Sequence, residues 1–181
     1  MSAIRSIQEK LGRMSLKSAQ KKFNRKVRAF NIEQASSIAI IYNATNRSDA
    51  DLVKKLVHFL KEERKEVLAL GYINTKDSSE LVKPHLNYSY FDKKDLNKSL
   101  IPKGSTIDNF IQKPFSILID LNYKPCFPIE YITTLSRAKF KVGASGGYRD
   151  EACDLTIDIH QNKSLEFLII QIRHYLQMIH N

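Results

Sequence analysis

Polar side chains that could bind a ligand follow two of the most apolar runs in the chain. Asp120 and Asn122 end one run, and Asn43 and Arg47 come shortly after another. The carboxyl ends of parallel strands meet at one edge of a sheet, where α/β proteins usually hold their ligands. We therefore expect these four side chains to surround one possible crevice.

A second set of candidates lies in the loop 143–151, which contains three of the six glycines. Successive glycines allow backbone amides to form a concave anion site, and nearby Ser and Arg side chains would add donors. A flexible connection between two strands is the other interpretation. With the first set, the candidate crevice comprises Asn43, Arg47, Asp120, Asn122, Ser145, Gly146, Gly147 and Arg149.

Several enzyme classes lack the residues that they need. The turn 43–48 contains no glycine, which argues against a dinucleotide site or a P-loop. Asp120 has no catalytic partner nearby in the sequence, and a carboxylate in its position more often accepts hydrogen bonds from loop amides. The histidines form no metal-binding motif, and Cys126 has no activating base beside it. We therefore expect no catalytic residue, no cofactor and no metal, and the pattern leans away from an enzyme.

The positive charge is concentrated in the first 30 residues. Of the formal net charge of +10, residues 1–30 carry +8, because they hold nine basic side chains and one acid, and residues 31–181 carry the other +2. A basic segment of this kind can bind a polyanion. The candidate polyanion-binding residues are Arg5, Lys10, Arg13, Lys17, Lys21, Lys22, Arg25, Lys26 and Arg28.

Apolar residues repeat at helical spacing within this basic arm. The repeat predicts two amphipathic helices that meet near residues 12–15, one with Ile4, Ile7, Leu11 and Met14, the other with Phe23, Val27 and Phe30. Three hypotheses follow. The arm binds RNA or a ribosomal surface, lies on an anionic membrane surface, or docks its apolar residues on the domain and leaves its charges in water.

The rest of the chain, 31–181, alternates apolar strands with amphipathic helices. Strands are expected at 38–42, 67–73, 88–91, 115–122, 140–142 and 155–159, and helices at 49–63, 105–112, 129–138 and from 165 onward. Ser48 and Ser105 are the expected caps of the first two helices. This order predicts a single Rossmann-like α/β domain, a three-layer sandwich whose mostly parallel sheet has five to six strands, with 115–122 at its centre.

Several strings also resemble a known family. They are 35–42, 91–97, 101–103, 110–121, 127–143 and 154–158, of which Ser136-x-Ala-Lys-Phe-x-Val-Gly143 is the most specific. The chain resembles an uncharacterised family of small basic proteins from Bacteroidota, which implies the same fold and a cytoplasmic location but no catalytic residue. Residues 115–143 are also similar, more faintly, to the amino-terminal half of heptosyltransferase-type glycosyltransferases, a likeness of fold alone.

Composition agrees with a cytoplasmic location. No apolar run approaches the roughly 20 residues that cross a bilayer, the amino terminus lacks a secretory signal, and the two cysteines have no CxxC spacing. The oligomeric state cannot be read from the sequence.

Together these patterns favour a non-enzymatic binding module that presents its basic arm to a polyanionic partner, with RNA or the ribosome first. One alternative is a small enzyme or a binder of nucleotide sugars or phosphorylated metabolites at the sheet edge. The other is peripheral membrane association through the arm.

Overall fold

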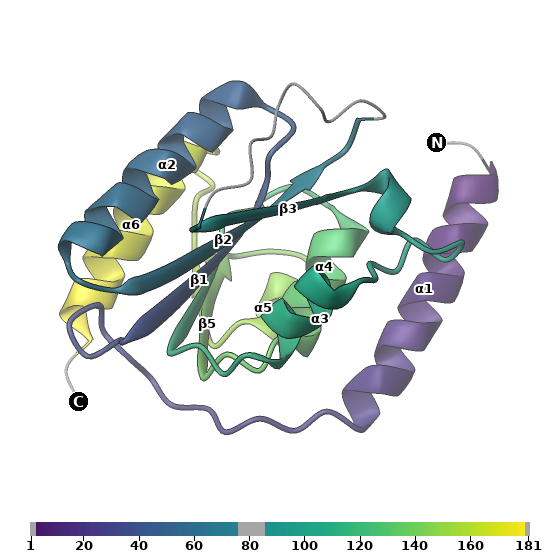
Figure 1. Ribbon diagram of the computed structural model, residues 1–181, viewed down its shortest axis with the longest axis horizontal. Coiled ribbons are helices and arrows are strands. Elements are labelled where there is room, and N and C mark those ends of the chain that lie inside the picture. Colours follow the sequence, from purple (N-terminus) through teal and green to yellow (C-terminus); the bar gives the residue numbers. More distant parts are fainter. Residues whose placement is uncertain (1–2, 76–85, 180–181) are drawn as a thin grey trace.

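The computed structural model describes residues 3–75 and 86–179 and contains a six-stranded, all-parallel sheet (Figure 1). The strand order is β3-β2-β1-β4-β5-β6. The strands are β1 (Ser37–Asn43), β2 (Glu66–Ile73), β3 (Tyr88–Asp92), β4 (Ile117–Asp120), β5 (Phe140–Ala144) and β6 (Leu155–Ile157). The predicted Rossmann-like α/β fold is therefore confirmed.

The two central strands, β1 and β4, are the most apolar because helices cover both of their faces. Every residue of β4 is buried, and in β1 only the two end residues, Ser37 and Asn43, are partly exposed. Their register pairs Ile38 with Ile117 and Ile41 with Asp120, so Asp120 lies at the carboxyl edge of the sheet. The central position predicted for 115–122 is confirmed.

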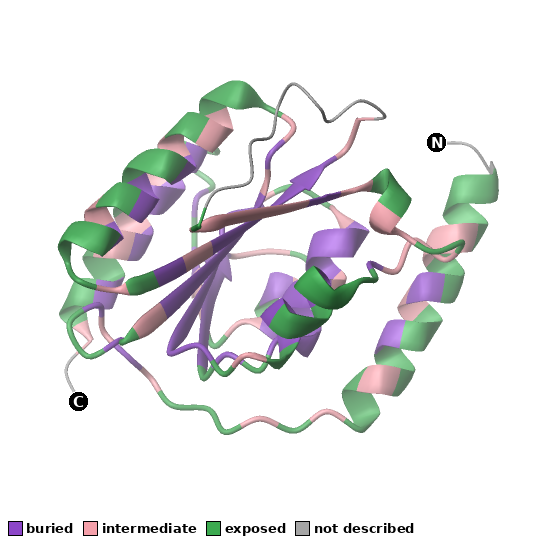
Figure 2. Cartoon of the chain, in the orientation of Figure 1, coloured by how far each residue is buried: buried purple, intermediate pink, exposed green. Residues whose placement is uncertain are grey.

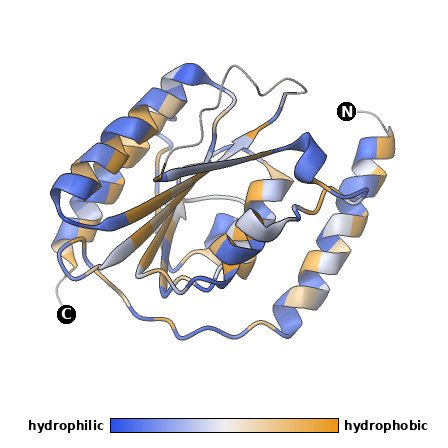
Figure 3. Cartoon of the chain, viewed as in Figure 1, coloured by the Kyte–Doolittle hydropathy of each residue, from blue (hydrophilic) through white to orange (hydrophobic). Residues whose placement is uncertain are grey.

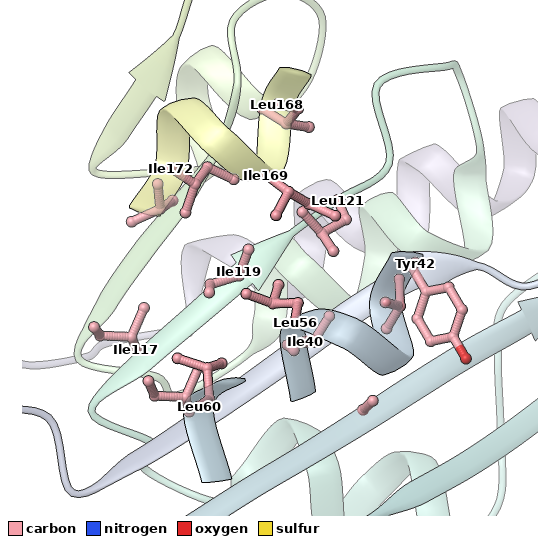
Figure 4. Close-up of a cluster of buried hydrophobic side chains, with 14 of the residues drawn as sticks. Ile40, Tyr42, Leu56, Leu60, Ile117, Ile119, Leu121, Leu168, Ile169 and Ile172 are labelled. Carbon is pink, nitrogen blue, oxygen red and sulfur yellow. The ribbon is translucent and has the colours of Figure 1, made fainter. Parts of the chain in front are cut away.

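Two layers of helices enclose the sheet. One face is covered by α2 (Arg47–Glu62) and α6 (Leu165–Met178), whose apolar side chains meet those of β1 and β4 (Figure 4). The other face is covered by α3 (Ser105–Gln112) and α4 (Phe127–Leu135). A short α5 (Arg149–Ala152) follows β5, and a single 3₁₀ turn, η1 (Lys93–Asp95), follows β3. Figure 2 shows the buried residues concentrated between these layers.

The starts of two helices differ from the predicted caps. Asn46, not Ser48, caps α2: its side-chain oxygen accepts a hydrogen bond from the Ser48 amide at 3.0 Å. The cap of α3 is Gly104, with φ of +121°, and Ser105 is the first helical residue. Asn and Ser are both good caps, so the turn geometry decides between neighbouring candidates.

The arm consists of one helix and one irregular segment. Helix α1 (Ala3–Lys21) runs without a break through Gly12, and residues 23–30 are neither helix nor strand, so the prediction of a second helix there is wrong. The irregular segment bonds to the domain instead of to itself. The Arg28 amide donates to the carbonyl of Lys139 at 3.0 Å, and the Arg25 guanidinium binds the Asp154 carboxylate at 2.6 Å. Helix α1 lies outside α4 (Figure 1).

Candidate functional site

Asp120, at the end of β4, ties together the loops that form the sheet edge. Its side chain is fully buried and accepts hydrogen bonds from the Asn122 amide at 2.9 Å, the Thr133 hydroxyl at 2.8 Å and the Tyr148 hydroxyl at 2.6 Å. Burial raises the pKa of Asp120, and these three hydrogen bonds act in the opposite direction. The carboxylate therefore joins the loops of the sheet edge, as expected for a carboxylate that accepts hydrogen bonds from loop amides. Asp120 does not line the cavity that opens at this edge.

Arg149 has a similar supporting position. Its guanidinium is buried and donates to the carbonyl oxygens of Ala144 at 2.8 Å and Asn122 at 2.9 Å. These bonds join the loop after β5 to the loop after β4. Burial and the neighbouring Asp120 carboxylate raise the pKa of Tyr148 well above its ordinary value, so the Tyr148 hydroxyl remains a hydrogen-bond donor.

A cavity of about 660 Å³ opens above this network at the carboxyl edge of the sheet. That volume lies within the range of small-molecule sites. Gly146 and Gly147 form the turn beside it with φ of +100° and +65°, which glycine adopts without strain. Of the candidate crevice residues, Ser145, Gly146, Gly147 and Arg149 line this cavity.

The other candidates lie elsewhere. Asn43 and Asn122 line a separate, smaller cavity of about 190 Å³ on the β1 side of the edge, and Arg47 is exposed at the start of α2. Asn43 also borders a third cavity of about 460 Å³ beside the start of α1, so the structure divides the predicted crevice among several cavities above a buried network.

Helix α1 forms one wall of the large cavity, through Arg13, Leu16, Lys17 and Gln20. The arm and the sheet edge, which are far apart in the sequence, therefore share one surface. Leu16 is buried in the apolar cluster around α4, and Arg13 binds Glu130 of α4 at 2.5 Å and Glu9 at 2.8 Å. Burial raises the pKa of Glu130, and the Arg13 charge opposes that shift.

Gly12 permits the close approach of α1 to the domain. A Cβ atom at this position would lie 2.3 Å from the carbonyl oxygen of Ser99 and 2.5 Å from the ring of Phe127, closer than real Cβ contacts. The glycine that suggested a joint between two helices is a packing contact instead.

The opposite face of α1 carries exposed apolar side chains, and Figures 2 and 3 show exposed and hydrophobic residues along this helix. Ile4, Ile7, Leu11 and Met14 are 70%, 61%, 52% and 61% exposed. Val27 of the irregular segment is also exposed, whereas Phe23 is half-buried and Phe30 is buried. The hypothesis that all of these apolar residues dock on the domain is therefore wrong for Ile4, Ile7, Leu11 and Val27. We call the four helical residues 4, 7, 11 and 14 the outward stripe.

Among the nine candidate polyanion-binding residues, Arg13 and Arg25 form ion pairs with acids of the domain or of α1 itself. The remaining seven side chains are exposed to solvent: Arg5, Lys10, Lys17, Lys21, Lys22, Lys26 and Arg28. Most of the charge predicted for the arm is thus on the surface.

A buried lysine in β5 was missed by the sequence reasoning. Lys141 is 1% exposed, and its ammonium nitrogen lies 2.9 Å from the carbonyl oxygen of Thr134. Burial, followed by the nearby Arg25 charge, lowers the pKa of Lys141 to about 7. The signal was present in the sequence, because 140–142 was expected to form a parallel strand and such strands seldom carry a charged residue.

Cys126 lies in an environment that does not favour a reactive thiol. Burial raises the pKa of Cys126 to about 11, so its thiol stays protonated at neutral pH. Within residues 3–75 and 86–179, no three His, Cys, Asp or Glu side chains are grouped to hold a metal ion.

Comparison with known proteins gives a family and no activity. A search of curated proteins and a search of solved structures found no match, so the likeness to heptosyltransferase-type enzymes stays a prediction. A family model described as a family of unknown function, DUF6913, matches residues 8–179. The matched region starts within α1 and includes all six strands. Because the match covers nearly the whole chain, the protein belongs to this family of unknown function.

Proposed function

We propose that the protein is a non-enzymatic binding module that docks the outward stripe of α1 on an anionic membrane surface. The observation that carries this proposal is the exposure of the stripe, since each of its four side chains is more than half exposed. A helix that used these residues for folding would bury them. Their exposure beside basic residues is typical of helices that lie in the interface of a bilayer.

The lysines of α1 are suitably placed for this role. At 100° per residue, Lys10, Lys17 and Lys21 fall along one flank of the outward stripe, and the docked residues Gly12 and Leu16 fall on the opposite side. The apolar side chains could enter the headgroup region while the ammonium groups meet lipid phosphates. Each engaged cation contributes about 1 kcal/mol, so binding would be reversible and sensitive to salt.

Association would be peripheral. Within the two described ranges, no helix is long and apolar enough to cross a membrane. The stripe spans residues 4–14, which corresponds to roughly 15 Å of helix and lies parallel to a surface more readily than across it.

The stripe also guides the choice among partners. RNA would engage the exposed lysines and leave four aliphatic side chains in water, because nucleic-acid surfaces recruit cations and aromatic side chains. A second copy of the chain could cover the stripe, but it would bring the lysine rows of two α1 helices together. An anionic lipid surface satisfies both the apolar and the charged features.

Flotation with lipid vesicles tests the proposal. We expect the full-length protein to float with vesicles containing phosphatidylglycerol, to remain unbound with phosphatidylcholine alone, and to dissociate as salt is raised. The double variant Ile7→Asp/Leu11→Asp should lose flotation at least tenfold. Ile170→Asp, which changes a residue of α6 that is 53% exposed, is the matched control and should bind normally.

RNA binding is the informative alternative outcome. If RNA retains the protein in a salt-dependent manner, and if Lys10→Glu/Lys21→Glu abolishes retention while Ile7→Asp/Leu11→Asp does not, the partner is a nucleic acid and the membrane proposal fails. Point variants are preferred to removal of residues 1–30, because Phe30 is buried in the core and Arg25 binds Asp154.

A second candidate function is supported by the large cavity at the sheet edge. Its walls carry Lys17 and Lys163 beside the Gly146-Gly147 turn, together with Glu151 and the Arg13–Glu130 ion pair. Lysine side chains near a glycine turn suit a phosphorylated metabolite or a nucleotide sugar. A thermal-shift screen with such compounds should raise the melting temperature, and Lys163→Ala should weaken that response. A flat screen would count against this function and would leave the membrane proposal untouched.

A further inference from the structure

Lys141 occupies an unusual environment for a lysine. It points from β5 into the layer beneath α4, where neighbouring strand positions are apolar, and it is almost fully buried. Within the described ranges, no carboxylate oxygen lies within 4.0 Å of its ammonium nitrogen. A buried ammonium without an ion-pair partner is costly, which favours the neutral amine.

The nearest acid is already committed to other donors. One Asp154 carboxylate oxygen accepts the Arg25 guanidinium at 2.6 Å, and the other accepts the backbone amide of Lys141 at 2.8 Å. Cys153 and Asp154 favour the charged form of Lys141, whereas burial and Arg25 oppose it and prevail. The carbonyl of Thr134, which remains as the hydrogen-bond acceptor, can be satisfied by a neutral amine as well as by an ammonium.

The amine adjoins a shallow cavity beneath the arm. This cavity has a volume of about 310 Å³ and is bordered by Gln20, Phe23, Asn24, Arg25, Thr134, Lys141, Glu151 and Ala152. The ring of Phe23 lies over the amine, with 5.4 Å between Nζ and the ring centroid. Phe23 belongs to the irregular segment of the arm and is only half-buried, so the ring that lies over the amine is itself reached by solvent.

We propose that Lys141 is a covalent modification site whose amine accepts an acyl group from small acyl phosphates. The lone pair of the neutral nitrogen attacks the acyl carbon, and the bond between that carbon and the phosphate oxygen breaks. Phosphate leaves with the electron pair and takes up one proton of the amine, which gives an amide and hydrogen phosphate. Arg25 and Glu151 border the same cavity, and Arg25 is ion-paired with Asp154, so the donor meets no large net charge at its rim.

The product suits the site better than the free lysine. An acylated Lys141 keeps one N–H for the Thr134 carbonyl and can no longer acquire a charge. The acyl group would fill the cavity beneath Phe23, so modification would alter the packing of residues 23–28 on the domain. The inference is independent of the membrane proposal, because it depends on the inner surface of the arm.

Acetyl phosphate and mass spectrometry provide the test. The full-length protein is treated at pH 7.5, and acetylation of Lys141 is compared over time with that of the exposed Lys10 and Lys139. An exposed lysine of ordinary pKa is about 0.1% neutral at this pH, so Lys141 should react at least tenfold faster even with restricted access. The rate at Lys141 should level off above about pH 7.5, unlike the rate at an amine of ordinary pKa.

Two variants test whether the ring of Phe23 limits the access of acetyl phosphate to the Lys141 amine. Phe23→Ala should accelerate acetylation of Lys141 several-fold, and Val27→Ala, which truncates an exposed residue of the same segment, should leave it unchanged. The proposal is overturned if Lys141 reacts more slowly than Lys139 in both the unmodified protein and Phe23→Ala, or if its pH profile follows that of Lys10.

Discussion

The two faces of α1 differ in how the fold uses them. The inner face docks through Gly12, Leu16 and Arg13, which supply close approach, apolar burial and an ion pair. The outward stripe is more apolar than the inner face, yet it remains in solvent. The difference teaches that the most hydrophobic face of a helix need not be the face that the fold uses, and that an unused apolar face points to an external partner.

The largest effect is expected beneath the inner face, at Lys141. Its folded pKa is lowered from the ordinary 10.5 to about 7, so between these values the unfolded chain binds the extra proton and stability rises with pH. Lys141→Met removes this dependence. We expect the variant to be more stable than the natural protein at pH 7, by several kcal/mol, and its advantage to shrink by about 1 kcal/mol per pH unit up to pH 9.

Urea unfolding at pH 7, 8 and 9 measures this difference directly. Other groups that titrate in this interval, such as the cysteines, cancel when the two proteins are compared at each pH. For Lys139→Met, at an exposed position two residues away, the difference in free energy of unfolding from the natural protein should not change with pH. An advantage of Lys141→Met that stays constant from pH 7 to pH 9 would contradict the assignment of a neutral buried amine.

Leucines on the two faces of α1 give the next largest contrast. Leu16→Ala removes a side chain that is 4% exposed and should lower the free energy of unfolding by about 2–4 kcal/mol, because it loses buried apolar contacts and leaves a cavity. Leu11→Ala changes a side chain that is 52% exposed and should change stability by less than about 0.5 kcal/mol. Equal losses in the two variants would show that both faces are buried.

Gly12 tests how closely α1 must approach the domain. Gly12→Ala improves helix propensity by about 1 kcal/mol, but its methyl group would collide with Ser99 and Phe127. We expect a net loss of about 1–2 kcal/mol in urea unfolding. Ser15→Ala, on an exposed part of the same helix, should be neutral or slightly stabilising. A stabilising Gly12→Ala would place α1 farther from the domain.

The ion pair between Arg13 and Glu130 should have the smallest effect. Arg13 is 42% exposed, so solvent screens the pair, and Glu130→Gln should cost only about 1 kcal/mol. Asp51→Asn, which breaks the exposed pair with Lys54 on α2, should cause no measurable change. If Glu130→Gln is as mild as Asp51→Asn even at low salt, the inner face is held by apolar packing alone.

Sequence patterns were sufficient for the layers of the fold but not for the orientation of the arm. Buried runs such as 115–122 predicted a central parallel strand, because only strands covered on both faces are continuously apolar. The spacing of Ile4, Ile7 and Leu11 predicted a helix, but amphipathicity does not state which face meets the domain. That choice depended on the shape of Ser99 and Phe127 around Gly12, which no local pattern records.

The candidate site was predicted in part for a related reason. The glycine turn at 146–147 was recognised from residue type, and it does line the large cavity. The hydrogen bond from the Tyr148 hydroxyl to Asp120 was not predicted, because the two residues are 28 positions apart in the sequence. Lys141 differs from both, since its position within an expected buried strand could have identified it from the sequence alone.

The most direct test of the central claim uses a fluorescent reporter on each side of the molecule. The chain contains no tryptophan, so Ile7→Trp places a single reporter in the outward stripe and Ile170→Trp places one on α6. With phosphatidylglycerol vesicles, we predict a blue shift and quenching by brominated lipid chains for Ile7→Trp and no response for Ile170→Trp. No response from Ile7→Trp, or equal responses from both reporters, would contradict the claim that the outward stripe is the membrane-binding face.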